Sequence, residues 1–186
     1  MNNKEKFVIY EKLLRQWSEK MNLVAPSTLS DIQSRHFDDS AQLEKYIPKD
    51  TNIIDLGSGA GFPGVVLAIL GWNVTCIESI RKKTLFLSAL KTELDLPNLT
   101  IINDRIENYL SKIPVKAGNF VFTARAFAPL IKILDYTHKT KCRLFLLKGR
   151  DVQNEINTAK TKYKFDYDLF PSTTGDGYIL YIKNIK

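Results

Sequence analysis

The sequence lacks paired cysteines, long apolar runs and internal repeats. Its two cysteines, Cys76 and Cys142, form no CxxC motif and no disulfide framework, which favours a reducing compartment. No apolar run approaches the roughly 18 residues of a membrane span, and the opening residues, MNNKEKF, lack the apolar segment of a secretory signal. We therefore expect a cytoplasmic protein without a membrane partner, large enough to fold without a metal.

Acidic residues are scarcer than basic ones. The 186-residue chain carries 27 Lys and Arg against 20 Asp and Glu, which gives a net charge of +7. Its 44% hydrophobic content is typical of a globular domain and excludes a disordered chain. The basic excess lies in residues 116–186, which hold 13 basic and 6 acidic side chains. This distribution favours a polyanionic partner, with the phosphate attraction centred between Arg125 and Arg150.

From Thr51 onward, short apolar stretches alternate with amphipathic segments of helical length. Continuous apolar stretches are typical of strands buried on both faces of a parallel sheet, and the alternation indicates a doubly wound α/β fold. The closely spaced last two stretches predict an antiparallel hairpin at one end of the sheet. The expected strands are residues 52–56, 73–77, 99–102, 120–123, 143–147, 165–170 and 178–182, and the helices between and after them are 64–70, 81–94, 106–110, 129–138 and 151–162.

The first 50 residues show helical periodicity instead. Apolar side chains recur at helical spacing between Phe7 and Trp17. Thr28 or Ser30 is expected to cap a short second helix, and Asp38 or Asp39 a third. Because no linker follows, we expect a single domain over residues 1–186, with a helical cap at 1–50 and a Rossmann-like core at 51–186.

The most informative segment is the run from Asp55 to Phe62, which contains the alternate glycines Gly57, Gly59 and Gly61. Glycines allow a tight turn and a close approach of a ligand to the backbone. A P-loop would need a Lys-Ser/Thr pair that is absent, and a dinucleotide site needs a later third glycine. The pattern D-x-G-x-G-x-G instead matches the first motif of methyltransferases that use S-adenosyl-L-methionine, so we take Asp55, Gly57, Gly59 and Gly61 as cofactor-binding candidates. A ligand-free glycine turn is the plainer alternative.

Further polar residues follow the neighbouring strands. Glu78 ends the second strand, where a carboxylate can accept both hydroxyls of a ribose. The segment 103–107 follows the third strand, where an adenine would lie. The fourth strand ends without the (Asp/Asn)-Pro-Pro-(Tyr/Phe) motif of many enzymes that methylate exocyclic amino groups. Neither cysteine lies at a strand's carboxyl end, so a cysteine nucleophile is not expected.

Arg125 and Lys148 follow strands four and five, on the same rim as the glycine loop. Either is a solvated charge or a partner for a cofactor carboxylate, a guanine O6 or a phosphate. His36 with Asp39 is either a helix-cap cluster or part of a lid on the substrate side. We therefore take Arg125, Lys148, His36 and Asp39 as candidates on the substrate side.

Several motifs in a fixed order resemble one family. They are Arg35-His36-Phe-Asp-Asp39-Ser40, Asp55-Leu-Gly-Ser-Gly-Ala-Gly-Phe-Pro-Gly64, Glu78-Ser79, Arg105-Ile106-Glu107, Arg125-Ala126-Phe127 and Lys148-Gly149. Together they look like the bacterial ribosomal small-subunit RNA guanine-N7 methyltransferase family, also called glucose-inhibited division protein B. The resemblance runs from about Trp17 to Lys148 and is weaker at the C-terminus, where 175–181 lacks an Arg-His pair often seen there.

The resemblance implies an enzyme that methylates N7 of one guanine in the decoding-region loop of 16S ribosomal RNA. It also implies S-adenosyl-L-methionine contacts at Gly57, Phe62, Ile106, Glu107 and Arg125. The expected partner is 16S rRNA or the small ribosomal subunit rather than DNA. The sequence contains no obvious dimer motif, so we expect a monomer. A methyltransferase for another RNA or a small molecule, and a non-catalytic RNA-binding assembly factor, remain alternatives.

Overall fold

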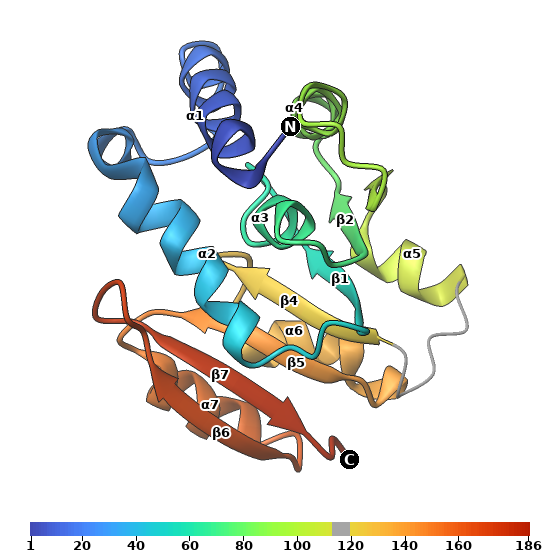
Figure 1. Ribbon diagram of the computed structural model, residues 1–186. Coiled ribbons are helices and arrows are strands. Elements are labelled where there is room, and N and C mark those ends of the chain that lie inside the picture. Colours follow the sequence, from blue (N-terminus) through green and yellow to red (C-terminus); the bar gives the residue numbers. More distant parts are fainter. Residues whose placement is uncertain (113–119) are drawn as a thin grey trace.

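A computed structural model describes residues 1–112 and 120–186 and contains one seven-stranded sheet (Figure 1). The strand order is β3-β2-β1-β4-β5-β7-β6. Strands β1 to β5 run parallel, whereas β7 is antiparallel to both β5 and β6. The predicted fold class is therefore confirmed. The strands are β1 (Asn52–Leu56), β2 (Val74–Glu78), β3 (Leu99–Asn103), β4 (Phe120–Arg125), β5 (Arg143–Lys148), β6 (Asp166–Pro171) and β7 (Tyr178–Lys183).

Two hydrophobic clusters cover the two faces of the sheet. Neighbouring residues of β1 show the division, because Ile53 belongs to one cluster and Ile54 to the other. This two-sided burial explains why the strands read as continuous apolar runs. The first face carries α1 (Asn3–Ser18), α3 (Gly64–Ile69) and α4 (Arg81–Glu93), and the second carries α5 (Ile106–Lys112), α6 (Leu130–Thr137) and α7 (Val152–Lys160). In the described part of the chain, no helix has both the length and the apolar character to cross a membrane.

The C-terminal hairpin places its connecting loop beside the carboxyl ends of the parallel strands. Strand β7 lies between β5 and β6, and its first residue, Tyr178, pairs with Lys148 at the end of β5. Pro171 at the end of β6 pairs with the same Tyr178. The loop over residues 172–177 therefore lies at the sheet edge where parallel strands present their ligand-binding loops.

The N-terminal segment differs from the prediction after its first helix. Helix α1 begins with a capping box, in which Asn2 and Glu5 exchange hydrogen bonds between side chain and backbone. Beyond it, no side-chain cap forms at Asp38 or Asp39, and both have helical backbone angles. The predicted second and third helices are instead one continuous run of short helical pieces: η1 (Pro26–Asp31), η2 (Gln33–Asp38), α2 (Asp39–Ala41) and η3 (Gln42–Lys45). The Asp39 carboxylate bonds to other elements, so it is not free to cap a helix.

Candidate active site

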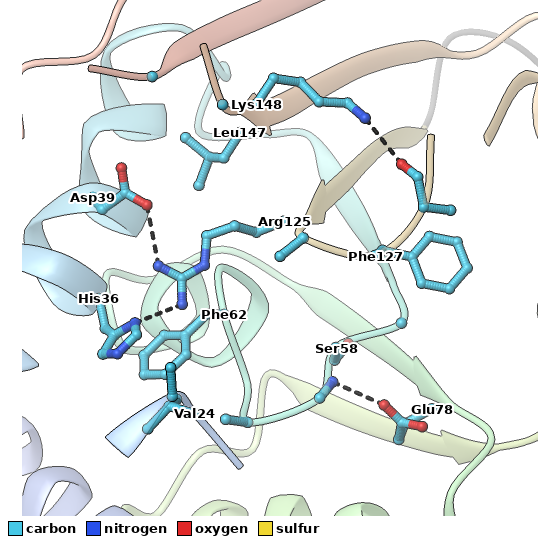
Figure 2. A pocket seen from close by; sticks show the side chains of 18 of the residues that line it. Val24, His36, Asp39, Ser58, Phe62, Glu78, Arg125, Phe127, Leu147 and Lys148 are labelled. Atoms are coloured by element: carbon cyan, nitrogen blue, oxygen red, sulfur yellow. Dashed lines mark hydrogen bonds and ion pairs between the residues drawn. The ribbon is translucent and has the colours of Figure 1, made fainter. Parts of the chain in front are cut away.

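A cavity of about 1250 Å³ opens at the carboxyl ends of the parallel strands. It lies between the ends of the neighbouring strands β1 and β4. The chain continues from β1 to β2 on one side of this point and from β4 to β5 on the other, and such a switch point is the usual ligand position in these sheets. Figure 2 shows side chains from the N-terminal segment, the glycine loop and the ends of β2, β4 and β5 around it. The predicted site residues that line the cavity are Gly57, Gly59, Phe62, Glu78, Ile106, Glu107, Arg125, Lys148, His36 and Asp39.

The glycine loop is shaped by left-handed backbone angles. Gly57 has φ +66° and Gly59 has φ +55°, which residues with side chains rarely adopt. A methyl group on Gly57 would also overlap the ring of Phe127, which lies directly against it. Both the conformation and the close contact therefore require glycine at position 57.

Asp55 and Gly61, which were also expected to contact the ligand, do not line the cavity. Asp55 is fully buried, and its carboxylate accepts from the Thr123 hydroxyl at 2.9 Å and from the Gly64 N–H at 3.2 Å. Burial raises the pKa of Asp55 to about 6, although these hydrogen bonds oppose the shift. Gly61 faces the cap, where an added Cβ would lie 2.5 Å from the Tyr10 hydroxyl oxygen. Both residues therefore help to hold the glycine loop in place without lining the cavity.

Glu78 links the second strand to the glycine loop. Its Oε2 accepts from the Gly59 N–H at 2.9 Å and its Oε1 from the Ile80 N–H at 2.8 Å. The residue is buried apart from 6% of its surface and borders the cavity. A carboxylate has about four acceptor positions, so two remain for donors of a bound ligand. The backbone bonds hold the side chain ready for them.

Arg125 ties the end of β4 to the N-terminal cap (Figure 2). Its Nη1 donates to the Arg35 carbonyl oxygen at 3.0 Å and to Asp39 Oδ2 at 3.1 Å, and its Nη2 donates to His36 Nδ1 at 2.8 Å. The guanidinium also lies 4.7 Å from the centre of the Phe62 ring. With five N–H donors, Arg125 retains capacity for a ligand carboxylate.

The state of His36 follows from these contacts. Arg125 can only donate, so His36 Nδ1 accepts and the proton lies on Nε2, 2.8 Å from Thr28 Oγ1. Burial and the adjacent Arg125 charge lower the pKa of His36 to about 4. The neutral ring stacks on Phe62 with centroids 4.9 Å apart. His36 thus serves as a hydrogen-bond acceptor and packing surface at neutral pH.

Asp39 extends the Arg125 network to the hairpin loop. Its Oδ1 accepts from Thr174 Oγ1 at 3.0 Å and from Gln42 Nε2 at 2.9 Å. Gln42 also bonds to Ser172 and to the Thr173 N–H. The N-terminal segment, the hairpin loop and the end of β4 therefore meet at the Asp39 carboxylate, which does not cap a helix.

Lys148 and Arg150, expected on the basic rim, both have acidic partners. Lys148 Nζ lies 2.7 Å from Glu155 Oε2, and Arg150 pairs with Asp176 of the hairpin loop.

The segment after β3 is held by hydrogen bonds within itself, since Asp104 accepts from the Arg105 N–H and from the Asn108 side chain. Ile106 is buried there, while Glu107 is exposed at the cavity.

Two residues that shape this site were not predicted from the sequence. The Tyr10 hydroxyl donates to the Ala60 carbonyl oxygen at 2.6 Å, which anchors the glycine loop to α1. Glu155 is the partner of Lys148. Helical spacing marked Tyr10 only as an apolar position, and no local pattern marks Glu155 as more than a surface acid of a polar helix.

Comparison with known proteins agrees with this geometry. A family model described as GidB, rRNA small subunit methyltransferase G, matches residues 3–174. Two proteins named ribosomal RNA small subunit methyltransferase G are similar to the chain. The one from Orientia tsutsugamushi (strain Ikeda) is 44% identical over 183 residues, covering 96% of this chain and 89% of its own length. The one from Dinoroseobacter shibae is 40% identical over 178 residues, covering 90% and 88%.

Solved structures share the fold at low sequence identity. An S-adenosylmethionine-dependent methyltransferase from Aquifex aeolicus has a TM-score of 0.62 and 12% identity, covering 94% of this chain and 98% of that one. A mutant of MtNAS, solved in complex with S-adenosylmethionine, has a TM-score of 0.61 and 13% identity, covering 98% and 76%. The family match and the shared fold lead to one conclusion. The chain belongs to the rRNA small subunit methyltransferase G family and is an S-adenosylmethionine-dependent methyltransferase.

Proposed function

We propose that the protein transfers a methyl group to N7 of a specific guanine in the decoding-region loop of 16S ribosomal RNA. The observation that carries the proposal is the cavity at the β1–β4 crevice, where the glycine loop, Glu78 and Arg125 converge. Family membership supports RNA as the acceptor, since the relatives are named as ribosomal RNA methyltransferases.

The polar groups around one half of the cavity fit S-adenosylmethionine. We propose that the remaining lone pairs of Glu78 accept the ribose hydroxyls and that Ile106 and Glu107 border the adenine. Gly57 and Arg125 then border the methionine portion, where the guanidinium can pair with the carboxylate. Gly59 and Phe62 complete the cofactor contacts, whereas Asp55 and Gly61 support them from beneath.

When bound, S-adenosylmethionine supplies a methyl group on a positively charged sulfur. Guanine N7 has a free lone pair, so the reaction needs no base to remove a proton. The task of the chain is therefore to align N7 with the methyl group and exclude competing geometries. We assign no general base to His36, which is engaged with Arg125 and Thr28.

The second half of the cavity is left for the acceptor base. It is bordered by residues 126–129, 147–149, 172 and 174–178, contributed by the β4–α6 loop, the end of β5 and the hairpin loop.

We propose that residues 1–50 form a cap on a core at 51–186 within one domain that acts as a monomer. The burial of Tyr10 and Leu14 in the same hydrophobic cluster as Ile53 supports the single domain.

Calorimetry with the purified protein tests the cofactor assignment. S-adenosylmethionine should bind, and NAD should not, because the glycine spacing does not fit a dinucleotide. NAD binding without S-adenosylmethionine binding would refute the assignment.

Mapping of methylated bases tests the substrate assignment. Small-subunit RNA from cells that lack the protein should have lost N7-methylguanine at one site and regain it when the gene is restored. An unchanged map would exclude this substrate, and a missing ribosomal assembly step with an unchanged map would favour the non-catalytic assembly factor.

A further inference from the structure

Lys148 ends β5 at the rim of the cavity, where a free lysine would be available to an RNA phosphate. Its side chain is only 8% exposed. Its Nζ donates to the Ala128 carbonyl oxygen at 3.0 Å and to Glu155 Oε2 at 2.7 Å (Figure 2 shows the first of these bonds). Freeing the ammonium would leave the half-buried Glu155 carboxylate without its cationic partner, which costs stability. The geometry is therefore that of an internal tie.

Glu155 makes a second contact that explains what is tied. Its Oε2 also accepts from the Leu130 N–H at 2.6 Å, at the first residue of α6. A carboxylate there satisfies one of the unpaired donors of the helix start. The Lys148–Glu155 pair thus joins the end of β5, helix α7 and the start of α6.

The tie acts on the β4–α6 loop, defined here as residues 126–129. Ala126 has φ +49°, a strained conformation that persists only where its surroundings hold it. Phe127 lies against Gly57, and all four residues of the loop line the cavity. The Ala128 carbonyl on one side and the Leu130 N–H on the other bracket Pro129. One ion pair therefore fixes the end of the loop that enters α6.

We propose that Lys148 and Glu155 are positioning residues, which hold the β4–α6 loop against the glycine loop so that the acceptor guanine meets the methyl group in line. This inference rests on the proposed function and assigns Lys148 no contact with RNA phosphate. The pair bonds to Ala128 and Leu130 rather than to Glu78 or the glycine loop, so we expect cofactor binding to be retained when the pair is broken.

Lys148→Met keeps the apolar stem and removes the tie. Single-turnover methyl transfer should fall by about 10- to 100-fold, the cost of misaligned reacting atoms. The Kd for S-adenosylmethionine and the salt dependence of RNA binding should both stay at the wild-type value. Lys148→Arg should restore much of the rate, since its N–H groups can donate to both oxygen atoms. The control is Lys162→Met, which breaks the pair between Lys162 and Asp135 that joins the turn after α7 to α6, outside the cavity lining.

Glu155→Gln distinguishes positioning from phosphate binding. If Lys148 served phosphates, removal of its competing carboxylate would strengthen RNA binding. Positioning predicts a slower rate with unchanged RNA affinity. A flatter salt dependence in Lys148→Met, or equal losses of cofactor affinity, melting temperature and rate in both variants, would overturn the inference. An inactive wild-type protein would refute the proposed function, whereas an active wild type with a fully active Lys148→Met would refute this inference alone.

Discussion

Arg125 joins the cofactor half of the cavity to the cap through its bonds to Asp39, His36 and the Arg35 carbonyl. Arg125→Ala should lower methyl transfer by roughly 100-fold, because a preorganised cationic fork is lost. Unfolding free energy should fall by only about 1–3 kcal/mol, the cost of partners left unsatisfied. Enzyme assays and thermal melts measure the two effects.

Two further variants qualify that result. Arg125→Lys keeps the charge and loses the fork, so it should remain impaired. Arg15→Ala removes an exposed pair with Glu11 on α1 and should leave activity intact. Proportional losses of activity and stability in Arg125→Ala would make this residue structural only.

His36 gives a pH signature of its own. Its pKa is about 4 in the folded protein, below its ordinary value of 6.5, so the unfolded chain binds the proton first as pH falls. The stability that His36 contributes is thus fully present above pH 6.5 and is lost as pH falls toward 4, by at most about 1.4 kcal/mol per pH unit.

His36→Gln removes this titration. The stability advantage of the wild type over the variant should therefore shrink between pH 6.5 and pH 4, measured by urea unfolding. Asp55, with its pKa raised to about 6, has the opposite pH dependence, but it is present in both proteins and cancels in the difference. An advantage that is independent of pH would contradict the assigned His36 state.

Helix α1 supports the glycine loop through one buried hydroxyl. Tyr10→Phe leaves the Ala60 carbonyl without its partner and should cost about 1–2 kcal/mol of unfolding free energy. S-adenosylmethionine binding should weaken as well, because the loop loses its anchor. Tyr46→Phe is the control, since the Tyr46 hydroxyl has no hydrogen-bond partner in the described parts of the chain. Equal cofactor affinity in both variants would show that α1 does not anchor the loop.

The elements that could be predicted from sequence are those encoded locally. The strands follow from apolar runs and the glycine loop from its spacing, and both are confirmed. The helix boundaries predicted at Asp38 and Asp39 were wrong, because Asp39 bonds to Arg125 and Thr174, which are distant in the chain. The role of Lys148 was hidden for a related reason. Its rim position was correctly predicted, but a partner in the following helix removes its charge from the surface.

Across the whole molecule, the structure changes where an RNA backbone is expected to bind. The basic excess between Arg125 and Arg150 predicted phosphate contacts there, but Arg125, Lys148 and Arg150 each pair with an acidic side chain. Arg35, Lys83 and Arg105 also line the cavity, and among residues 1–112 and 120–186 none of their side chains has an acidic partner within 4 Å. These three are the better candidates for phosphate contacts.

The salt dependence of RNA binding tests this choice. Each substitution of Arg35, Lys83 or Arg105 by Ala should reduce the slope of log affinity against log salt by about 1. Arg150→Ala, which removes a surface pair with Asp176, should leave the slope unchanged. A slope that falls for Arg150→Ala and not for the other three would return the contact to the β4–β5 region.

The most direct test of the whole mechanism uses small ribosomal subunits from cells that lack the protein. These are incubated with purified protein and labelled S-adenosylmethionine, and the label is located by nuclease digestion and mass spectrometry. We predict label on N7 of one guanine in 16S rRNA. Label on another atom or another base, or no label in any RNA, would contradict the assignment.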